Sequence, residues 1–564
     1  MAIFNLSEHA DKEDLSLNIF KTASLFETIE KSCDAGFHRP ALRYFGKDIS
    51  YGDLFENIDN CKRALMSFGI MKGDVIACAL PTIPEAIYIF FLCCNKIGAI
   101  VQWIDVRITN EELANALKKT NARLLFIMAF NIKRTPTLED IPCEQVIILR
   151  GCDTFPNSVQ FWFKFGEFFN GRWREAKKKN YIDYSSFIGN RACLNENPHK
   201  LAPSSSEEVA VIFPTSGTTG TPKYVQLTNG AINFSIENGL LNDPAVGDVW
   251  MASIPIFVAT GLIWNVHYPL SRGMTVHVIP YMEPEKFPAF MRRIKPNHLC
   301  SIPSYWKFVL DDKVGQDTED YSYLKSVIVA GESLGVAFEK KINAFLKGHG
   351  VVHSLITAYG MTETACSGTV KIEGTGFYSE GSVGIPIRHI SIKIVNEKDE
   401  EVPRNQPGEI CIKTPHCTPG YVGDEEETSN LIRRHSDGEM WIHSGDMGYL
   451  SESGELFLVG RKKRMLVHVS GSKIFAEEIE RVVKSHPCVL ECAVIGTDIF
   501  DRCVGGIVAY VIPQNKAVSK RDIIKICREK LPSHCVPSEI KFVEKLPRIG
   551  MGKINYKMLE DGAV

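Results

Sequence analysis

The chain has 564 residues, which exceeds the usual size of one domain and predicts a large body with at least one further domain. Its composition, 45% hydrophobic and 23% charged, is ordinary for a soluble globular protein. The formal charge of −3 lacks the basic excess typical of nucleic-acid binders. Seventeen cysteines, without a CxxC pair or a metal-like Cys/His spacing, indicate reduced, mostly buried thiols in a cytoplasmic protein.

The N-terminal part contains no pattern typical of membrane targeting. Residues 1–11 are acidic and lack a basic segment followed by an apolar core, so we expect no signal peptide. The longest apolar run, residues 86–94, is too short to span a membrane and is typical of a buried helix. We therefore expect no transmembrane segment.

Strand-like apolar runs alternate with helical periodicity through the first two thirds of the chain. These runs are residues 74–80, 124–127, 146–149, 209–213 and 326–330. Their alternation with helices predicts an α/β body with largely parallel sheets. From about residue 391, short amphipathic strands predict a small β subdomain. After residue 460, a mixed pattern with a helix over residues 520–530 predicts a compact C-terminal domain.

Residues 161–180 mix aromatic side chains with lysines and arginines. Such a mixture is compatible with peripheral membrane contact through a surface helix. A helix packed on the body with a solvated basic end explains the same pattern, and we favour it because soluble proteins commonly bury such a stripe.

A loop made of hydroxyl residues, glycines, a proline and a terminal lysine joins two predicted strands. It runs Thr215-Ser216-Gly217-Thr218-Thr219-Gly220-Thr221-Pro222-Lys223. Glycines let backbone N–H groups approach an anion, hydroxyls add donors, and the lysine adds a positive charge. Pro222 and Tyr224 flank the lysine where a Walker A loop requires Gly and Ser or Thr. The loop therefore predicts a different kind of polyphosphate site, with a plain polar hairpin turn as the alternative.

Three further segments carry polar chemistry. Residues 359–363 end in Glu363, a carboxylate of the type that holds Mg²⁺ beside a triphosphate, although such segments also begin helices. Asp446 ends the strand expected over residues 441–446 and could accept two ribose hydroxyl hydrogen bonds, with an ordinary Asp turn as the alternative. Lys553 follows two glycines near the C-terminus, where the alternative is a frayed tail.

These segments, in this order, resemble the adenylate-forming superfamily, which includes acyl-CoA synthetases, adenylation domains of nonribosomal peptide synthetases and firefly luciferase. The resemblance extends from residue 49 to Lys553, with further landmarks at residues 381–386, 408–410 and 460–463. It implies an α/β fold with a body over residues 1–460, containing two mostly parallel sheets and the β subdomain. It also implies a small mobile α+β C-terminal domain over residues 461–564, with a hinge at Lys463.

The resemblance also implies a reaction. ATP and a carboxylic acid give an acyl-adenylate and pyrophosphate, and a thiol then takes the acyl group. The implied catalytic residues are Thr218, Glu363 and Lys553, with Glu363 binding Mg²⁺. The implied nucleotide-binding residues are Thr215, Ser216, Gly217, Thr218, Thr219, Gly220, Lys223, Gly331, Glu332, Ser333, Tyr359, Gly360, Met361, Thr362, Asp446 and Arg461.

The acyl acceptor is expected to be coenzyme A. The implied CoA-binding residues are Lys462, Arg464, Ser470 and Gly471. The basic run at residues 461–464 could instead be a nuclear-localisation or nucleic-acid patch, but a single run in a slightly acidic chain disfavours this. The alternative acceptor is the phosphopantetheine arm of a carrier protein. No carrier-attachment segment follows Lys553, which favours free CoA; a third alternative is amide formation.

The sequence departs from the family pattern at two positions. The implied substrate pocket contains Phe257, Val258, Gly331 and Gly360. Val258 stands where many relatives have His, and where amino-acid-activating domains have an Asp that pairs with the substrate ammonium. Burying an ammonium without a partner costs several kcal/mol, so a fatty or aryl acid is expected instead of an α-amino acid. Arg464 stands where many relatives carry an acid.

Overall fold

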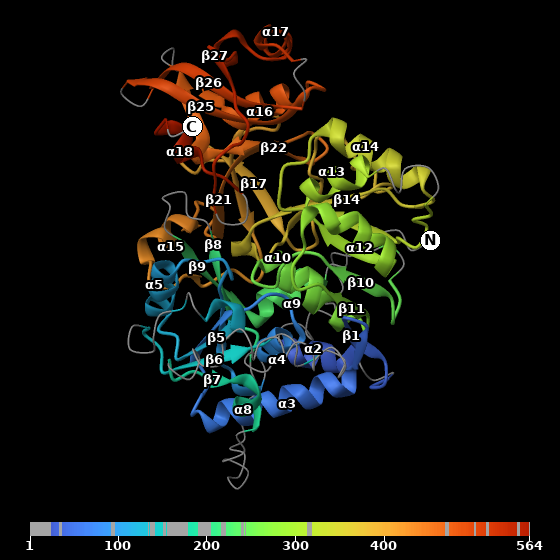
Figure 1. The fold of residues 1–564 in the computed structure, drawn as a ribbon. Coiled ribbons are helices and arrows are strands. Elements are labelled where there is room, and N and C mark those ends of the chain that lie inside the picture. Colours follow the sequence, from blue (N-terminus) through green and yellow to red (C-terminus); the bar gives the residue numbers. More distant parts are fainter. Residues whose placement is uncertain are drawn as a thin grey trace.

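The structure of this chain is a computed structural model, and the account below concerns the residues that it describes (Figure 1). These are residues 24–32, 36–91, 96–132, 135, 141–150, 154, 179–189, 205–215, 222–237, 242, 244–312, 319–468, 473–500, 503–514, 518–549 and 553–562. Residues 161–178 lie outside this set, so the structure does not test the membrane-surface alternative for that segment.

The first large sheet has eight strands. They are β3 (Val75–Ala79), β4 (Ile100–Trp103), β5 (Leu124–Met128), β6 (Gln145–Leu149), β7 (Ile182–Asp183), β8 (Val209–Thr215), β9 (Lys223–Thr228) and β19 (Gly420–Tyr421). Their order is β19-β9-β8-β4-β3-β5-β6-β7. Neighbouring strands from β8 to β7 are parallel, whereas β9 returns antiparallel to β8. β5 is buried at every position, as expected for a parallel strand covered on both faces.

The second large sheet has nine strands. They are β1 (Pro40–Tyr44), β2 (Lys47–Ser50), β10 (Val249–Ala252), β11 (Thr275–Val278), β12 (His298–Ser301), β13 (Ser326–Val329), β14 (Ile356–Gly360), β15 (Gly368–Lys371) and β16 (Ile385–Pro386). Their order is β16-β15-β14-β13-β12-β10-β11-β1-β2. The six strands from β14 to β1 are parallel, and antiparallel pairs close both edges. Both large sheets are therefore mostly parallel, as predicted.

Helices cover these sheets. The longer ones are α2 (Leu25–Ser32), α3 (Tyr51–Ser67), α4 (Pro84–Phe91), α5 (Asn110–Thr120), α8 (Tyr184–Gly189), α9 (Asn229–Glu237), α12 (Phe287–Ile294), α13 (Pro303–Asp311) and α14 (Val336–Gly348). A broken helix follows β10 and comprises α10 (Ala259–Leu262), the π-helix η4 (Ile263–His267) and α11 (Tyr268–Ser271). One apolar cluster contains side chains of both sheets, including Val101 of β4 and Trp250 of β10, so the two sheets share a core.

The helix predicted from the longest apolar run is α4. All eight of its residues are buried, which confirms the expectation of a buried helix. Among the described residues, no helix is both long and apolar enough to cross a membrane.

A small antiparallel sheet lies between the body and the C-terminal elements (Figure 1). Its strands are β17 (Ser391–Val395), β18 (Gly408–Lys413), β20 (Ile432–Arg434), β21 (Met440–Leu450) and β22 (Leu456–Arg461), and helix α15 (Glu425–Leu431) precedes β20. The order is β17-β18-β21-β20, with β22 also paired to β21. This is the β subdomain that the change of pattern near residue 391 predicts.

The C-terminal elements form a separate sheet and its helices. The strands are β23 (Met465–His468), β24 (Lys473–Phe475), β25 (Val489–Phe500), β26 (Cys503–Pro513) and β27 (Glu539–Phe542), and a hairpin of β28 (Arg548–Ile549) and β29 (Lys553–Ile554) follows. The helices are α16 (Ala476–Lys484), α17 (Lys520–Lys530) and α18 (Tyr556–Glu560). The bounds of α17 are those predicted from the sequence. Its N-terminus is fixed by Ser519, which forms a capping box with Asp522.

Candidate active site

The predicted phosphate loop joins the strands of a β-hairpin. Thr215 ends β8 and Lys223 begins β9, and the two residues pair directly across the hairpin. The hydroxyl of Thr215 donates a hydrogen bond to the carbonyl oxygen of Lys223 at 3.4 Å. Residues 216–221, which include Ser216, Gly217, Thr218, Thr219 and Gly220, lie outside the described residues. The structure thus places the two ends of the loop, and the phosphate-binding role of its middle stays a prediction.

Lys223 contacts two residues that the sequence analysis did not identify. Its Nζ atom lies 2.5 Å from Oε2 of Glu427 and 4.8 Å from the ring centroid of Tyr421. The hydroxyl of Tyr421 donates to Oε1 of Glu363 at 2.8 Å. Burial raises the pKa of Tyr421, as does the carboxylate of Glu363, so the hydroxyl retains its proton and serves as a donor. Tyr421 therefore connects the predicted phosphate-binding lysine to the predicted metal-binding glutamate.

Glu363 lies on the short 3-10 helix η6 (Thr362–Thr364), directly after β14 and Met361. The carboxyl group is buried, and the bond from Tyr421 fixes one of its oxygens. A buried, oriented carboxylate suits Mg²⁺, which prefers oxygen ligands and usually also binds substrate phosphates. The residues present therefore fit the magnesium ion that the resemblance implies.

Asp446 lies at the junction of two sheets. Its Oδ2 atom accepts a hydrogen bond from the hydroxyl of Tyr359 at 2.7 Å, and its Oδ1 atom lies 2.8 Å from Nε of Arg461. Burial raises the pKa of Asp446, and Arg461 and Tyr359 oppose this effect without cancelling it. The expectation that Asp446 ends a strand is wrong, because β21 continues to Leu450 and pairs with β22 through Arg461.

Three of the predicted nucleotide-binding residues, Gly331, Glu332 and Ser333, follow β13. Gly331 follows β13 with a φ of +84°, a conformation that favours glycine. Glu332 accepts hydrogen bonds from the backbone N–H and the hydroxyl of Ser304 at 3.1 and 3.2 Å, so its carboxylate anchors the start of α13. Ser333 is exposed in the following loop.

An apolar pocket opens beside these residues. Its lining comprises Ser235, Thr260, Trp264, Cys300, Ile328, Ala330, Gly331, Ala358, Tyr359, Gly360, Cys366, Gly368, Thr369 and Ile387. The lining within the described residues contains no Asp, Glu, Lys, Arg or His. Of the residues predicted for the substrate pocket, Gly331 and Gly360 line this pocket, and Phe257 and Val258 are not among its lining residues, although Thr260, two residues further on, is.

Two glycines near the pocket are required by close backbone contacts. A Cβ atom on Gly360 would lie 2.6 Å from the carbonyl oxygen of Cys366, and one on Gly261 would lie 1.9 Å from that of Pro255.

Cys366 is a cysteine of the pocket lining, and its thiol lies 3.5 Å from the hydroxyl of Thr260. Burial raises the pKa of Cys366 to about 11, so this thiol is protonated at neutral pH and is a poor nucleophile.

The predicted hinge and CoA-binding residues lie on the 3-10 helix η7 (Lys462–Arg464). Lys462 points to the β subdomain, with Nζ 2.6 Å from Oε2 of Glu409. Arg464 points to the C-terminal helices: its guanidinium lies 2.8 Å from Glu477 and 2.7 Å from Glu480.

Three other predicted residues of this region cannot be placed fully. Ser470 and Gly471 lie outside the described residues. The backbone of Lys553 is in β29, paired with Ile549 of β28, but its side chain is not described. The frayed tail considered as an alternative for Lys553 is therefore wrong. Its predicted contact with substrate stays a prediction.

The surroundings of Arg464 give it a structural role. Besides the two glutamates, its guanidinium carbon lies 3.7 Å from the ring centroid of Tyr556, so Arg464 fastens α18 to α16. We expect Arg464→Ala to lower the free energy of unfolding of the C-terminal domain by about 3 kcal/mol, because two partly buried carboxylates lose their partner. Urea unfolding of the full-length protein, followed by hydrogen exchange in α16, measures this loss.

The matched control for that variant is Arg481→Ala, in α16. The side chain of Arg481 is 54% exposed and lies 3.8 Å from Glu478, so its removal should cost about 1 kcal/mol or less. Equal effects of the two substitutions would contradict the structural role of Arg464.

With this geometry in view, comparisons with known proteins define the class. The model of the AMP-binding enzyme family matches residues 29–422, and the model of the AMP-binding enzyme C-terminal domain matches residues 478–553. The chain therefore belongs to the family of AMP-binding enzymes. This confirms the resemblance predicted from the sequence, the α/β fold class, and the prediction of an enzyme of the acid–thiol ligase type.

Particular relatives are similar over nearly the whole chain. A 4-coumarate–CoA ligase of Vanilla planifolia is 27% identical, covering 95% of this chain and 92% of its own length. The fatty acid–[acyl-carrier-protein] ligase ScoC of Streptomyces coeruleorubidus is 27% identical, covering 93% of each chain. The crystal structure of the anthranilate CoA ligase AuaEII in complex with anthranoyl-AMP matches with a TM-score of 0.79 at 20% identity, over 96% of this chain and 98% of its own.

Proposed function

We propose that the protein joins a fatty or aryl carboxylic acid to coenzyme A, using ATP and Mg²⁺. The observation that carries this proposal is one segment, residues 359–366, which contacts Asp446 and Tyr421 and contributes to the lining of the apolar pocket. The ring of Tyr359 lines the apolar pocket while its hydroxyl binds Asp446. Within the same segment, Glu363 accepts a hydrogen bond from the hydroxyl of Tyr421, whose ring lies beside Lys223. Cys366, at the end of the segment, lines the pocket again. An acyl group, a nucleotide and a cation would thus meet along eight consecutive residues.

The proposed reaction has two steps. A carboxylate oxygen of the acid attacks the α-phosphorus of ATP, and pyrophosphate leaves. The thiolate of CoA then attacks the acyl carbon, and AMP leaves. Bound Mg²⁺ would neutralise phosphate charge as pyrophosphate departs.

Individual residues have separate roles in this proposal. Lys223 and the loop after Thr215 bind phosphate oxygens. Asp446 accepts hydrogen bonds from the ribose hydroxyls, and Glu363 binds the metal ion. Lys553 supplies positive charge at the α-phosphate in the first step only. Placing these charges in advance lowers the barrier because negative charge increases at phosphorus in the transition state.

We further propose that residues 1–460 act as one body, that residues 461–564 turn against it, and that Lys463 is the hinge. The opposite attachments of Lys462 and Arg464 support this, since the chain passes from one unit to the other between them. A few residues that absorb a large backbone change are typical of such closures. CoA would bind near Lys462, Ser470 and Gly471.

A cytoplasmic location is part of the proposal. Eleven cysteines in the described part of the chain are free thiols, and several of these are buried in the core. Free thiols in such number are typical of a reducing compartment.

The alternative acceptor is the phosphopantetheine arm of a carrier protein. The similarity to ScoC, a fatty acid–[acyl-carrier-protein] ligase, supports this alternative, so the experiment includes it. Purified enzyme should be supplied with a panel of acids, and pyrophosphate release should be measured first without any acceptor. The best acid is then offered with free CoA or with a loaded carrier protein. Faster thioester formation with CoA supports the proposal, whereas faster transfer to the carrier protein overturns it in favour of the alternative.

The acid panel also tests the chemistry of the pocket. Because no carboxylate lines the pocket within the described residues, a substrate ammonium would be desolvated without a partner. We expect apolar fatty or aryl acids to release pyrophosphate at least about 100-fold faster than free α-amino acids, which corresponds to about 3 kcal/mol. Deaminated analogues of the same amino acids are the matched control, since they differ only in the ammonium. Faster turnover of any amino acid than of its deaminated analogue would contradict this prediction.

A further inference from the structure

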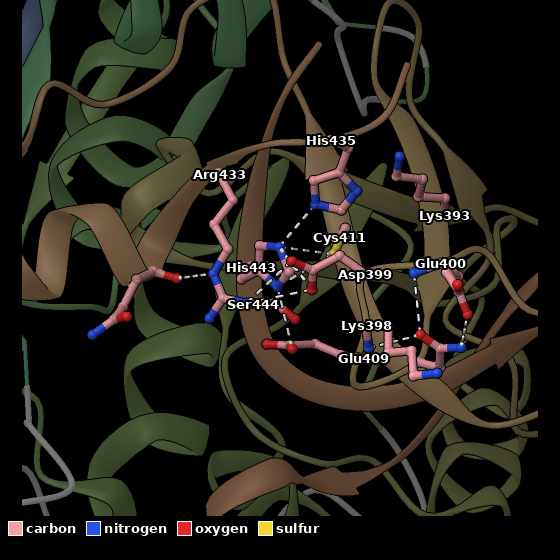
Figure 2. Close-up of polar contacts among 12 residues, drawn as sticks. Lys393, Lys398, Asp399, Glu400, Glu409, Cys411, Arg433, His435, His443 and Ser444 are labelled. Atoms are coloured by element: carbon pink, nitrogen blue, oxygen red, sulfur yellow. Dashed lines mark hydrogen bonds and ion pairs between the residues drawn. The ribbon is translucent and has the colours of Figure 1, made fainter. Parts of the chain in front are cut away.

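A cluster of one cysteine and two histidines lies inside the β subdomain, apart from the apolar pocket (Figure 2). Cys411 of β18 and His443 of β21 are paired directly across the sheet. His435 belongs to the turn that connects β20 to β21. All three are buried, with exposed fractions of 0%, 5% and 6% for Cys411, His443 and His435. Cys and His side chains are the ligands that Zn²⁺ prefers.

The candidate ligand atoms of Cys411, His435 and His443 all lie within 4.8 Å of one another. Nε2 of His443 lies 2.9 Å from Nε2 of His435 and 3.8 Å from Sγ of Cys411. A third neighbour, Oδ1 of Asp399, lies 3.8 Å from the same nitrogen. Bond lengths of about 2.0–2.1 Å to nitrogen and 2.3 Å to sulfur put tetrahedral zinc ligands about 3.3–3.6 Å apart. Small movements of these side chains would therefore enclose one ion.

A carboxylate orients the central histidine. Nδ1 of His443 lies 3.2 Å from Oε2 of Glu409, whose own position is held by Lys462. Donation of the Nδ1 proton to Glu409 leaves Nε2 with its lone pair on the side of His435, while Sγ of Cys411 lies 3.6 Å from Nδ1 and 3.8 Å from Nε2. A histidine held in this way by a carboxylate is the usual arrangement behind a zinc ligand. Nδ1 of His435 is buried without a hydrogen-bond partner among the described residues, whereas its Nε2 faces Nε2 of His443 and is the nitrogen available to an ion.

The fourth position gives access from solvent. The side chain of Asp399 is 32% exposed, and the guanidinium of Arg433 lies 3.3 Å from it. The other members of the cluster are enclosed by Trp441, whose ring lies 6.0 Å from that of His435. An ion can therefore enter beside Asp399 and meet a closed set of nitrogen and sulfur atoms.

We propose that Cys411, His435 and His443, with Asp399 as fourth ligand, form a structural site for Zn²⁺ or a cation of similar softness. On binding, the Cys411 thiol releases its proton to solvent as the sulfur–metal bond forms, so the two charges of the ion are balanced by one thiolate and one carboxylate. A thiolate with two imidazoles selects such an ion over Mg²⁺ or Ca²⁺, which prefer oxygen. This site is separate from the proposed magnesium site at Glu363 and does not depend on the proposed reaction.

The test uses the full-length protein without a polyhistidine tag and without nucleotide. Metal analysis of the protein as purified should find about one zinc per chain. After removal of metal with a chelator under reducing conditions, Co²⁺ serves as the probe. We expect one equivalent to bind and to give a thiolate-to-cobalt charge-transfer band with the intense visible bands of tetrahedral coordination. Zn²⁺ should then displace the cobalt and abolish both signals.

Variants assign the signals to the cluster. Cys411→Ser should remove the charge-transfer band, and His435→Ala should remove the tetrahedral visible bands and weaken Co²⁺ binding at least tenfold. The matched control, Cys492→Ser, removes another buried thiol, in β25, and should change neither signal. Substoichiometric binding by the wild type, or a charge-transfer band that persists in Cys411→Ser, would overturn the proposal and leave a hydrogen-bonded histidine pair. The wild-type titration decides the matter even if a variant fails to fold.

Discussion

Lys553→Ala should lower the rate of acyl-adenylate formation by about 10²- to 10³-fold, because one charge that stabilises the transition state at phosphorus is lost. Transfer of the acyl group from synthetic acyl-AMP to CoA should stay close to the wild-type rate. The position of Lys553 supports this separation of effects, since β29 belongs to the C-terminal elements whereas Thr215, Lys223 and Glu363 belong to the body. Pyrophosphate release measures the first step, and thioester formation measures the second.

The control for this variant is Lys557→Ala. Lys557 is an exposed lysine on α18, four residues along the chain, and should affect neither half-reaction by more than about twofold because exposed charges contribute little. If Lys553→Ala slowed both half-reactions equally, its assignment to the adenylation step would be wrong.

Glu363→Gln should have the second large effect. The substitution keeps the size of the side chain and the bond from Tyr421, since an amide oxygen also accepts a hydrogen bond, but it removes the charge offered to a cation. We expect the adenylation rate to fall by about 10²-fold and the Mg²⁺ concentration for half-maximal activity to rise. Adenylation measured over a range of Mg²⁺ concentrations at fixed ATP separates these two effects.

Tyr421→Phe tests the support of that carboxylate. It removes the hydroxyl that holds Glu363 and leaves the ring beside Lys223, so it should slow adenylation only several-fold, in line with the loss of one hydrogen bond. An unchanged Mg²⁺ dependence in Glu363→Gln would show that Glu363 is not the metal ligand.

The sequence predicted local elements well because their signals are local. The apolar run at residues 74–80 became β3, the run at residues 86–94 belongs largely to α4, and the helix expected over residues 520–530 is α17, capped by Ser519 and Asp522. Strand ends were harder to predict. Asp446 reads as the end of a strand, yet β21 continues through it because β22 and β18 supply pairing partners from other parts of the chain.

Residues of the candidate site were predictable only where they belong to a recognisable sequence motif. Lys223, Glu363 and Tyr359 stand in recognisable segments, whereas Tyr421 reaches Glu363 only because the two-residue strand β19 pairs with β9, almost 200 residues earlier in the chain. The absence of a metal-like Cys/His spacing was similarly uninformative. Cys411 and His443 lie far apart in the sequence and become neighbours through strand pairing.

The helix η7 has a mechanical consequence. Lys462 is tied to Glu409 of the β subdomain, while Arg464, two positions later, is tied to Glu477 and Glu480 of the C-terminal helix α16. If both anchors hold while the C-terminal domain turns, only the backbone torsions around Lys463 remain to accommodate the rotation. The rotation axis of the C-terminal domain would then pass close to this one residue. Because β28 and β29 lie far from that axis, a small torsional change at Lys463 would displace them by many ångströms.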